Sequence, residues 1–553
     1  MKRLLRLMLL SVSLCLLTRS GFSADIIVTY YKLPVLLGSK STPVIRLSVT
    51  AEPGEVGKEL SALELSFDGS TDIGDITGIK VYTSLGDSSI MPKLNPSQII
   101  ADLDAAGARN KVKLNYKIKN AGIHNFWITP GVKQNADLLN KITLQLQSVE
   151  LDGKQIPGDY SHKQQYRLAV PVRQHMQDQV HTSRIPGLAT SNKNTLLAIY
   201  DARYESARDL QGHMDIGVQR SFDKGQSWEP IQIALDMKDW GGLPEKFNGV
   251  SDAAILVDKN SGTIYIAGLW MHGVKNAQGV WEEGLSDTST VWNHQWRTKG
   301  SQPGFGVKQT SQFLITKSTD DGKTWSEPVN ITKQAKKKEW WLWAPAPGNG
   351  ITMEDGTLVF PSQGRDKNGT PFSNITYSKD GGKSWHTSNP AVQIDQGTTE
   401  CAVVELPGGE LMLNMRANRN KGLPSPDNGR AIATTKDLGV SWQNHPSSLH
   451  ALIEPTCMAS LYKHQGADNK EILFFCNPHS TSKRNNISLQ ASFDFGNSWK
   501  QANIILLDEW SGRGYSCITS IDEQTIGVIY EGSQADMVFQ QIPIAEFQDA
   551  KNN

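Results

Sequence analysis

The sequence predicts an all-β protein in which a β-sandwich precedes a repeat domain of the β-propeller type. Short β-rich runs separated by turn residues fill the region before residue 173, and one motif recurs five times after it. The composition agrees, because 48 glycines and 15 tryptophans among 553 residues favour many short strands joined by tight turns over a helical bundle.

The charge balance argues against two classes of function. Lys and Arg together number 56, as do Asp and Glu, so the formal net charge is zero. Proteins that bind nucleic acids or anionic membranes depend on an excess of basic residues. We therefore expect no nucleic-acid partner and no membrane insertion, but a soluble chain of more than one domain.

Residues 1–24 are predicted to be a secretory signal peptide. Lys2, Arg3 and Arg6 form a basic start, and residues 7–17 form an apolar run too short to span a bilayer. Small residues at the end of this segment suit cleavage. The mature protein is therefore expected to be exported, to the periplasm or the extracellular space.

Residues 25–172 are predicted to form the β-sandwich. The clearest β-rich runs cover residues 26–31, 44–49, 63–67 and 142–146, and the last three alternate apolar with polar residues as half-buried strands do. About eight such runs fit a sandwich of jelly-roll type. A polar stretch from Arg173 to Gln179 marks the boundary with a second domain, residues 180–550.

The second domain contains the repeat Ser/Thr-x-Asp-x-Gly-x-x-Trp. Its five copies have their aspartates at Asp223, Asp320, Asp380, Asp437 and Asp494. From the second copy onward the spacing is about 60 residues, which suits one four-stranded propeller blade. The first interval is longer and implies an insertion of roughly 40 residues, which we place at residues 270–310.

Each residue of the repeat has a turn-making task. Asp accepts backbone N–H groups of its own turn, Gly supplies a positive φ, and Trp packs an apolar face beside the turn. A ligand or calcium site is the competing interpretation, and we favour the structural one.

The cysteines predict no metal centre. Cys401, Cys457, Cys476 and Cys517 are widely spaced and lack any zinc-binding pattern. We expect neither a metal nor another cofactor, and the pairing of the thiols stays open.

These repeats resemble the Asp boxes of the sialidase family, and further motifs of that family follow in its order. They are Arg184-Ile185-Pro186, Asp201-Ala-Arg203 with Asp209, Thr399-Glu400-Cys401 with Arg416, Arg484 before the fifth repeat, and Gly514-Tyr515-Ser516 with Glu531. The resemblance covers about two thirds of the chain and implies a six-bladed β-propeller. Residues 25–172 resemble, in architecture and position, the lectin-like accessory domain of secreted bacterial sialidases, which is similar to carbohydrate-binding domains.

The resemblance assigns Arg184, Arg416 and Arg484 to a clamp for the substrate carboxylate. Sialic acid carries a carboxylate on its anomeric carbon, and arginine recognises carboxylates with a rigid, permanently charged fork. The three arginines belong to separate motifs, so only the folded domain can bring them together.

The resemblance also assigns Tyr515 as nucleophile, Glu400 as its base and Asp209 as acid/base. A carboxylate nucleophile would be repelled by the substrate carboxylate, whereas a neutral phenol is not. A phenol has a pKa near 10 and needs a base within hydrogen-bond reach. Asp209 needs a pKa raised by burial once substrate covers it.

Supporting roles follow from the same resemblance. Arg203 and Asp252 resemble the pair that reads the sugar 4-hydroxyl, and Glu531 resembles the carboxylate that holds Arg184. Gln363 is a candidate substrate contact. An aromatic cluster is open to two interpretations, an aglycone platform or core packing; it consists of Trp340, Trp341 and Trp343.

The sequence thus predicts an exported exo-α-sialidase that removes terminal α-linked sialic acids from glycoproteins, glycolipids and oligosaccharides. Retention through a tyrosyl-sialyl intermediate is implied. Two alternatives stay open. One is a trans-sialidase that transfers the sialyl group to another sugar or within itself, and the other is a non-catalytic sialic-acid-binding propeller.

Overall fold

The computed structural model describes residues 25–84, 94–104, 107–210, 212–273, 294, 301–422, 425, 428–467 and 469–547. The predicted signal peptide lies outside these residues. The prediction of an all-β fold is confirmed, since the only α-helix in the described ranges is α1 (Thr332–Ala335). No helix in those ranges is long and apolar enough to cross a membrane.

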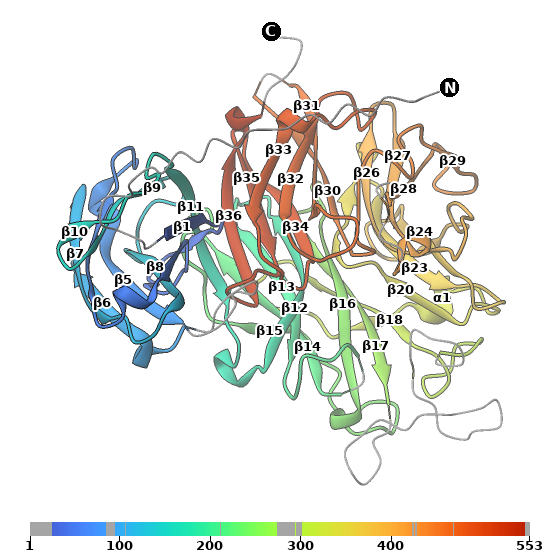
Figure 1. Ribbon diagram of the computed structural model, residues 1–553. Helices are drawn as coiled ribbons and strands as arrows, with labels where there is room; N and C mark the ends of the chain where they lie inside the picture. The colour runs from blue at the N-terminus through green and yellow to red at the C-terminus, as the bar shows by residue number, and fades with distance from the viewer. Residues whose placement is uncertain are drawn as a thin grey trace, which may run out of the picture.

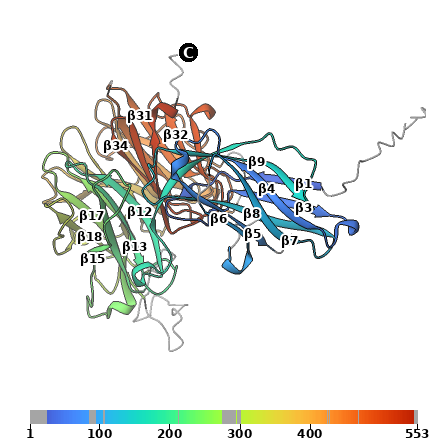
Figure 2. The ribbon, with the colours of Figure 1, turned by 90° about the vertical axis from the view of Figure 1, so that its left-hand side faces the viewer.

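Two sheets pack together in the N-terminal region (Figure 2). One has the order β1 (Asp25–Tyr30), β3 (Ile45–Ala51), β8 (Gly122–Val132), β5 (Ile76–Ser84) and β6 (Ile99–Asp104). The other contains β11 (Gln164–Arg173), β9 (Lys141–Leu151), β4 (Glu59–Ser66) and β7 (Arg109–Lys117), with short β2 (Val35–Leu36) and β10 (Lys154–Gln155) beside them. All the strand pairs of the two sheets are antiparallel except β2 with β11. Leu47, Val81, Leu65 and Leu144 from both sheets lie in one apolar core.

Strand β11 joins this region to the C-terminal strands. It pairs with β9 through Gln164–Arg167 and with β36 through Val170–Arg173, so the sheet continues without a break. The sheet then runs through β36 (Met537–Pro543), β35 (Thr525–Tyr530) and β34 (Ser516–Asp522). At the predicted boundary, Arg173 is fully buried, and its guanidinium binds Asp178 at 2.5 Å.

The remaining strands of the described ranges form four sheets. The first contains β12 (Thr182–Thr190), β13 (Leu196–Arg203), β14 (Met214–Ser221), β15 (Gln232–Leu235), β16 (Asn248–Val257), β17 (Ile264–His272), β18 (Gln312–Ser318), β19 (Val329–Asn330) and β21 (Gly348–Asn349). The second contains β20 (Leu342–Pro345), β22 (Ile351–Thr352), β23 (Leu358–Arg365), β24 (Pro371–Ser378) and β25 (His386–Thr387). The last two are β26 (Thr398–Leu406), β27 (Glu410–Ala417), β28 (Ala431–Thr435) and β29 (Gln443–Asn444), and β30 (Ser460–Gln465), β31 (Glu471–Pro478), β32 (Ile487–Ser492) and β33 (Ile504–Asp508).

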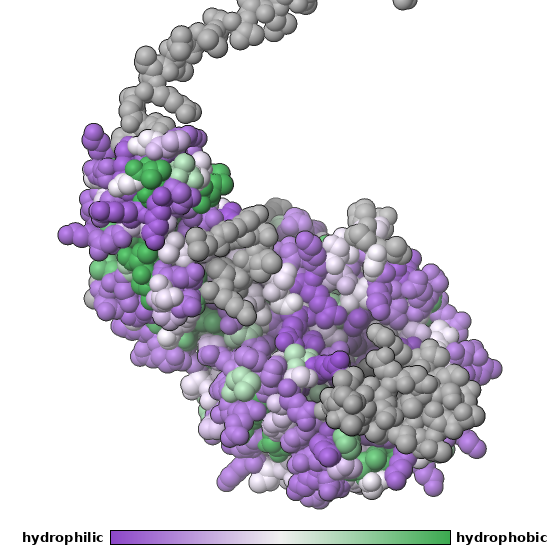
Figure 3. All heavy atoms as spheres, turned by 60° about the horizontal axis from the view of Figure 1, so that its bottom comes forward, coloured by the Kyte–Doolittle hydropathy of each residue, from purple (hydrophilic) through white to green (hydrophobic). Residues whose placement is uncertain are grey.

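Six strands from these sheets and from the sheet of β34 contact one another in series. Strand β12 contacts β16, β16 contacts β23, β23 contacts β26, β26 contacts β30, β30 contacts β34, and β34 contacts β12. Figure 1 shows these sheets following one another in colour order from cyan through green and yellow to red. On the face shown in Figure 3, hydrophilic residues predominate and hydrophobic residues form only small separate patches.

The Asp boxes form the turns that follow β14, β18, β24, β28 and β32. In the third box, Asp380 Oδ1 accepts hydrogen bonds from Ser378 Oγ at 2.8 Å and from the backbone N–H of Ser384 at 2.9 Å. The Gly382 N–H donates to Ser378 Oγ at 2.9 Å, and Gly382 has a φ of 75°. The other four boxes repeat this pattern, which confirms the turn-making interpretation.

The predicted insertion needs one correction. Strands β17 and β18 are paired neighbours, and the segment between them lies largely outside the described residues. Trp270, which we placed in the insertion, belongs instead to β17 and is buried, with its ring centroid 4.6 Å from that of Trp240. The four cysteines of the described chain are buried and unpaired.

Candidate active site

Most of the predicted site residues line one cavity of about 600 Å³. Its wall includes Arg184, Asp209, Asp252, Glu400, Arg416, Arg484 and Tyr515. They come from β12, β16, β26 and β27 and from the segments after β13, after β31 and before β34. Arg203 and Glu531 lie behind the wall.

Tyr515 and Glu400 form a buried hydrogen-bonded pair at the cavity wall. The phenol O–H of Tyr515 donates to Glu400 Oε1. Burial and the neighbouring Glu400 carboxylate raise the pKa of Tyr515 well above its usual value, while Arg416 and Arg484 act in the opposite direction. A phenol whose proton already points at a carboxylate is placed to lose it to that base as a bond forms at the phenol oxygen.

Three guanidinium groups converge on Tyr515. The Cζ atoms of Arg184 and Arg484 lie 5.4 and 5.5 Å from the centre of its ring, and Arg416 Nη1 lies 3.3 Å from its oxygen. Arg416 Nη1 also binds Glu400 Oε2 at 2.5 Å, but its buried Nε has no hydrogen-bond partner among the residues that the structure describes. Arg484 Nη1 donates to the carbonyl oxygen of Arg513 at 2.9 Å. The structure therefore brings the predicted clamp residues together.

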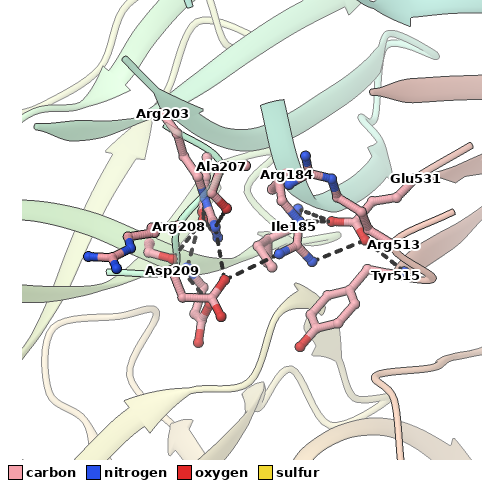
Figure 4. A network of polar contacts seen from close by, with 12 residues as sticks. Arg184, Ile185, Arg203, Ala207, Arg208, Asp209, Arg513, Tyr515 and Glu531 are labelled. Carbon is pink, nitrogen blue, oxygen red and sulfur yellow. Dashed lines mark hydrogen bonds and ion pairs between the residues drawn. The ribbon is translucent and has the colours of Figure 1, made fainter. Parts of the chain in front are cut away.

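Glu531 fixes the clamp and the nucleophile at once (Figure 4). Its carboxylate accepts hydrogen bonds from Arg184 Nε at 2.8 Å and Nη2 at 3.2 Å, and from the backbone N–H groups of Ile185 and Tyr515 at 3.0 Å each. Burial raises the pKa of Glu531, but the charge and hydrogen bonds of Arg184 outweigh burial and lower it. The carboxylate is thus held ionised beneath the cavity.

Asp209 projects into the cavity between two arginines (Figure 4). Its Oδ1 accepts hydrogen bonds from Arg203 Nη1 at 2.9 Å and Arg184 Nη1 at 3.2 Å, and its side chain is 72% exposed. Partial burial raises its pKa, but the charges of Arg203 and Arg184 outweigh burial, so the pKa lies below its usual value. The raised pKa expected of an acid is therefore not present in this arrangement.

The guanidinium of Arg203 is held by neighbouring groups behind the cavity wall. Its guanidinium binds Asp201 Oδ2 at 2.7 Å, the carbonyl oxygen of Ala207 at 3.0 Å and Asp209, and only 1% of the side chain is exposed. It lies outside the cavity wall and supports Asp209 from behind, and its role at a sugar hydroxyl stays a prediction.

Asp201 is a site residue to which the sequence analysis assigned no role. It is fully buried, and it accepts hydrogen bonds from Ser251 Oγ at 2.7 Å and from the backbone N–H of Asp252 at 3.2 Å. Burial raises the pKa of both Asp201 and Asp252. Asp201 shares a strand face with Arg203, which lies two residues further along the strand. This i, i+2 pairing of opposite charges could have indicated that Asp201 binds Arg203.

Irregular strand pairing aims three of the site side chains. Bulges interrupt the pairing beside Arg184 in β12, Asp252 in β16 and Glu400 in β26. Ile185 and Asp252 have φ values of 61° and 54°, in a region that side chains other than glycine rarely adopt. Bulges redirect side chains at functional sites, and here the Glu531 bond to the Ile185 N–H holds one of them.

The cavity wall contains further residues. Gln363, the candidate contact, is among them, and so are Arg365, Asn418 and Lys421, which we did not predict. Arg365 is two residues beyond Gln363 in β23 and shares its strand face, which could have indicated it. The tryptophan cluster does not line the cavity: Trp340 and Trp343 lie in an apolar core, and Trp341 is half-buried and donates from Nε1 to the Lys367 carbonyl at 3.2 Å.

Comparisons with known proteins agree with the site. The N-terminal domain of BNR-repeat neuraminidase matches residues 23–155, and the BNR repeat-like domain matches residues 185–494. A sialidase of Bacteroides fragilis is 38% identical over 99% of both chains, and a sialidase of Paraclostridium sordellii is 29% identical over 63% of this chain and 81% of its own. The structure of the Hadza microbial sialidase Hz136 superposes with a TM-score of 0.85 at 35% identity, covering 94% of this chain and all of that one.

Fold and site together define a glycoside hydrolase built from β-sheets. The chain belongs to the sialidase family and is an exo-α-sialidase.

Proposed function

We propose that this sialidase releases terminal α-linked sialic acids from glycoproteins, glycolipids and oligosaccharides with retention of configuration, through a sialyl group attached to Tyr515. One observation carries the proposal: the buried phenol of Tyr515 donates to Glu400 at the wall of a cavity where three arginines converge. A Tyr nucleophile is one of the known exceptions among glycosidases, most of which use a pair of carboxyl groups.

The first step is binding of the substrate carboxylate by Arg184, Arg416 and Arg484. Their convergence supports this role, and the buried, unpartnered Nε of Arg416 is a donor that lacks an acceptor. The carboxylate sits on the anomeric carbon, so binding it brings that carbon close to the phenol oxygen of Tyr515.

The second step forms the intermediate. The Tyr515 oxygen attacks the anomeric carbon while its proton moves to Glu400, the bond to the leaving oxygen breaks, and Asp209 protonates that oxygen. Asp209 then takes a proton from water, the water oxygen attacks the same carbon, and Tyr515 leaves and recovers its proton from Glu400. Two inversions give overall retention.

Substrate binding also supplies the missing pKa change. The positive charge of Arg184 lowers the pKa of Asp209 in the free enzyme. A substrate carboxylate bound to Arg184 partly neutralises that charge, and it also places a negative charge near Asp209. Both effects raise the pKa of Asp209 and allow it to hold the proton that it must deliver.

Asp252 is proposed to bind a sugar hydroxyl, the 4-hydroxyl on the family resemblance. Burial and the neighbouring Asp201 raise its pKa, and its carboxyl group lies at the cavity wall, where its oxygens can accept from a hydroxyl. Arg203 is proposed to contribute by holding Asp201 and Asp209.

We further propose that the sheets close into a six-bladed propeller over residues 180–550. The chain of contacts from β12 through β16, β23, β26 and β30 to β34, and from β34 to β12, supports six blades around one axis. Residues 25–172 are proposed to be a carbohydrate-binding accessory domain, and residues 1–24 to direct export.

Two experiments test the mechanism. Treatment with a 3-fluoro sialosyl fluoride should label one peptide that contains Tyr515, and the Tyr515→Phe variant should give no label. The ring fluorine slows both formation and release of the intermediate, but the fluoride leaving group keeps formation fast, so the intermediate accumulates. Proton NMR of sialyllactose cleavage should show the α-anomer of free sialic acid first. An initial β-anomer or labelling elsewhere would contradict the mechanism, and an anhydro or sialylated product would indicate transfer.

A further inference from the structure

One wall of the cavity carries two cations that the proposed reaction does not use. Arg365 ends β23, and Lys421 follows the short 3-10 turn Asn418–Asn420 after β27. Both side chains line the cavity together with the arginine clamp. Arg365 belongs to β23 and Lys421 to the segment after β27, so their presence at one cavity is a property of the fold.

The two cations belong to one continuous wall. Arg365 pairs with Pro371 across β23 and β24, and the Gly397 backbone packs so tightly on the Pro371 carbonyl that a Cβ atom would lie 2.1 Å from its oxygen. The backbone N–H of Asn418 donates to the Gly397 carbonyl at 3.1 Å, and that of Lys421 donates to the Asn418 carbonyl at 3.0 Å.

Neither cation has an acidic partner in the described part of the chain. The Arg365 side chain makes one hydrogen bond, from Nη1 to the Gly369 carbonyl at 3.1 Å, and its buried Nε makes none. Burial lowers the pKa of Arg365, and no carboxylate acts against this effect. In contrast, Arg184 and Arg416 are paired with Glu531 and Glu400.

A half-buried guanidinium without a counter-charge favours an anion. The sialyl carboxylate is not available for this role, because the clamp around Tyr515 binds it. An anion beside Arg365 must then come from another part of the same substrate. The chemical groups that fit are a second carboxylate, as on a neighbouring sialic acid, and a sulfate ester on a neighbouring sugar.

We propose that Arg365 and Lys421 form a second anion subsite, which binds a negatively charged group on the glycan unit next to the sialic acid being released. The enzyme then favours doubly anionic glycans over neutral sialyllactose-type substrates. This inference rests on the proposed arginine clamp, which fixes the orientation of the terminal sugar.

The test compares kcat/KM for three substrates: sialyllactose, its α2,8-linked disialyl form and a form sulfated on the neighbouring sugar. We expect wild-type enzyme to prefer at least one doubly anionic substrate. In Arg365→Gln plus Lys421→Gln, that preference ratio should fall about tenfold or more, because both charge-assisted contacts to the second anion are lost. Arg419→Gln, which removes a charge in the same turn but outside the cavity wall, should keep the wild-type ratio.

The two sources of the anion give different results. A fall confined to the disialyl substrate identifies a carboxylate, and a fall confined to the sulfated one identifies a sulfate. An unchanged ratio in the folded double variant overturns the subsite but leaves the proposed function intact. Failure of wild-type enzyme to release sialic acid from any of the three substrates would instead overturn the proposed function.

Discussion

At the scale of single residues, the site is organised by pairs of opposite charge that share hydrogen bonds. Glu531 neutralises Arg184 and holds the backbone of Tyr515, and Glu400 contacts both Arg416 and the Tyr515 phenol. Each acid therefore connects the clamp to the nucleophile. Removal of one acid disturbs substrate binding and chemistry together.

The Glu531→Gln substitution should lower kcat/KM by more than tenfold. The amide cannot accept from Arg184 and both N–H groups with the strength of a carboxylate, and it leaves a buried charge without its partner. A matched control is Glu546→Gln, which removes an acid paired with Arg167 and Lys141 outside the site and should leave kcat/KM near wild type. The measurement is kcat/KM of both variants on an aryl sialoside. Equal losses in Glu531→Gln and Glu546→Gln would contradict the role of Glu531.

The loss of kcat/KM caused by the Asp209→Asn substitution should depend on the leaving group of the substrate. Natural sialosides need a proton on the departing oxygen, whereas an aryl sialoside with an acidic phenol leaves with little help. Loss of kcat/KM on sialyllactose should exceed the loss on the aryl sialoside by about a hundredfold, within the usual 10²–10⁴ range for acid catalysis. If both substrates lose activity equally, Asp209 is not the acid.

The site was only partly predictable from single residues. Arg184, Arg416, Arg484 and Tyr515 belong to motifs that the sequence displays, and they line one cavity. The position of Arg203 was not predictable, because it depends on the buried carboxylate of Asp201 and on the loop that carries Asp209. Which carboxylates the Arg203 guanidinium binds is determined by packing in the folded protein, and the sequence spacing does not show it.

At the scale of elements, the Asp-box turns fix where neighbouring sheets touch. Gly382 lies against Tyr265 of β17, and Gly225 lies against Phe539 of β36. The box thus combines a positive φ with a close approach to the adjacent sheet. The spacing of the boxes predicted the repeating sheets, but the bulges at Arg184 and Asp252 leave no comparable pattern because any residue can be the extra one.

The Gly382→Ala substitution should destabilise the protein more than Gly381→Ala. Both glycines have positive φ, at 75° and 66°, so both variants incur left-handed strain of roughly 1–2 kcal/mol. A Cβ at Gly382 would also lie 2.8 Å from the Tyr265 ring, whereas nothing lies within 4 Å at Gly381. Thermal unfolding of both variants should give a lower Tm for Gly382→Ala, and equal Tm values would contradict the contact.

At the scale of the whole molecule, the two regions share a sheet and a core. Leu168 and Val170 of β11 lie in the same apolar cluster as Leu188 and Tyr200 of the repeat region. The sequence shows only a polar stretch at this point, because pairing between β11 and β36 joins segments that are remote in the chain. The N-terminal region therefore contributes to the structure that carries the site.

A protein that begins at Gln177 should be much less stable than one that begins at Gln164. The shorter form lacks β11, which leaves the edge of β36 unpaired and exposes the cluster around Tyr200. We expect a Tm lower by roughly 10 °C or more, or aggregation, since several kcal/mol of apolar burial are lost. A Gln177 form with the Tm and aryl-sialoside turnover of the Gln164 form would show that β11 is dispensable.

The N-terminal region also reaches the segment that carries Tyr515. Trp510 packs against Tyr31 and Trp127 at ring-centre distances of 4.9 and 6.0 Å, and Glu509 exchanges two hydrogen bonds with Lys32. The same segment, a few residues on, supplies the carbonyl of Arg513 that binds Arg484 Nη1 at 2.9 Å. The aromatic contacts therefore hold a loop that orients a clamp residue and leads into the nucleophile.

Tyr31→Ala should accordingly lower kcat/KM for an aryl sialoside although Tyr31 lies outside the cavity wall. An aromatic contact contributes about 0.5–1.5 kcal/mol. If all of this energy stabilises the active arrangement of the loop, its loss lowers kcat/KM by roughly two- to twelvefold. Tyr31→Phe retains the ring and should stay near wild type. A Tyr31→Ala protein that loses stability but keeps wild-type kcat/KM would show that the contact fastens the two regions without orienting Arg484 and Tyr515.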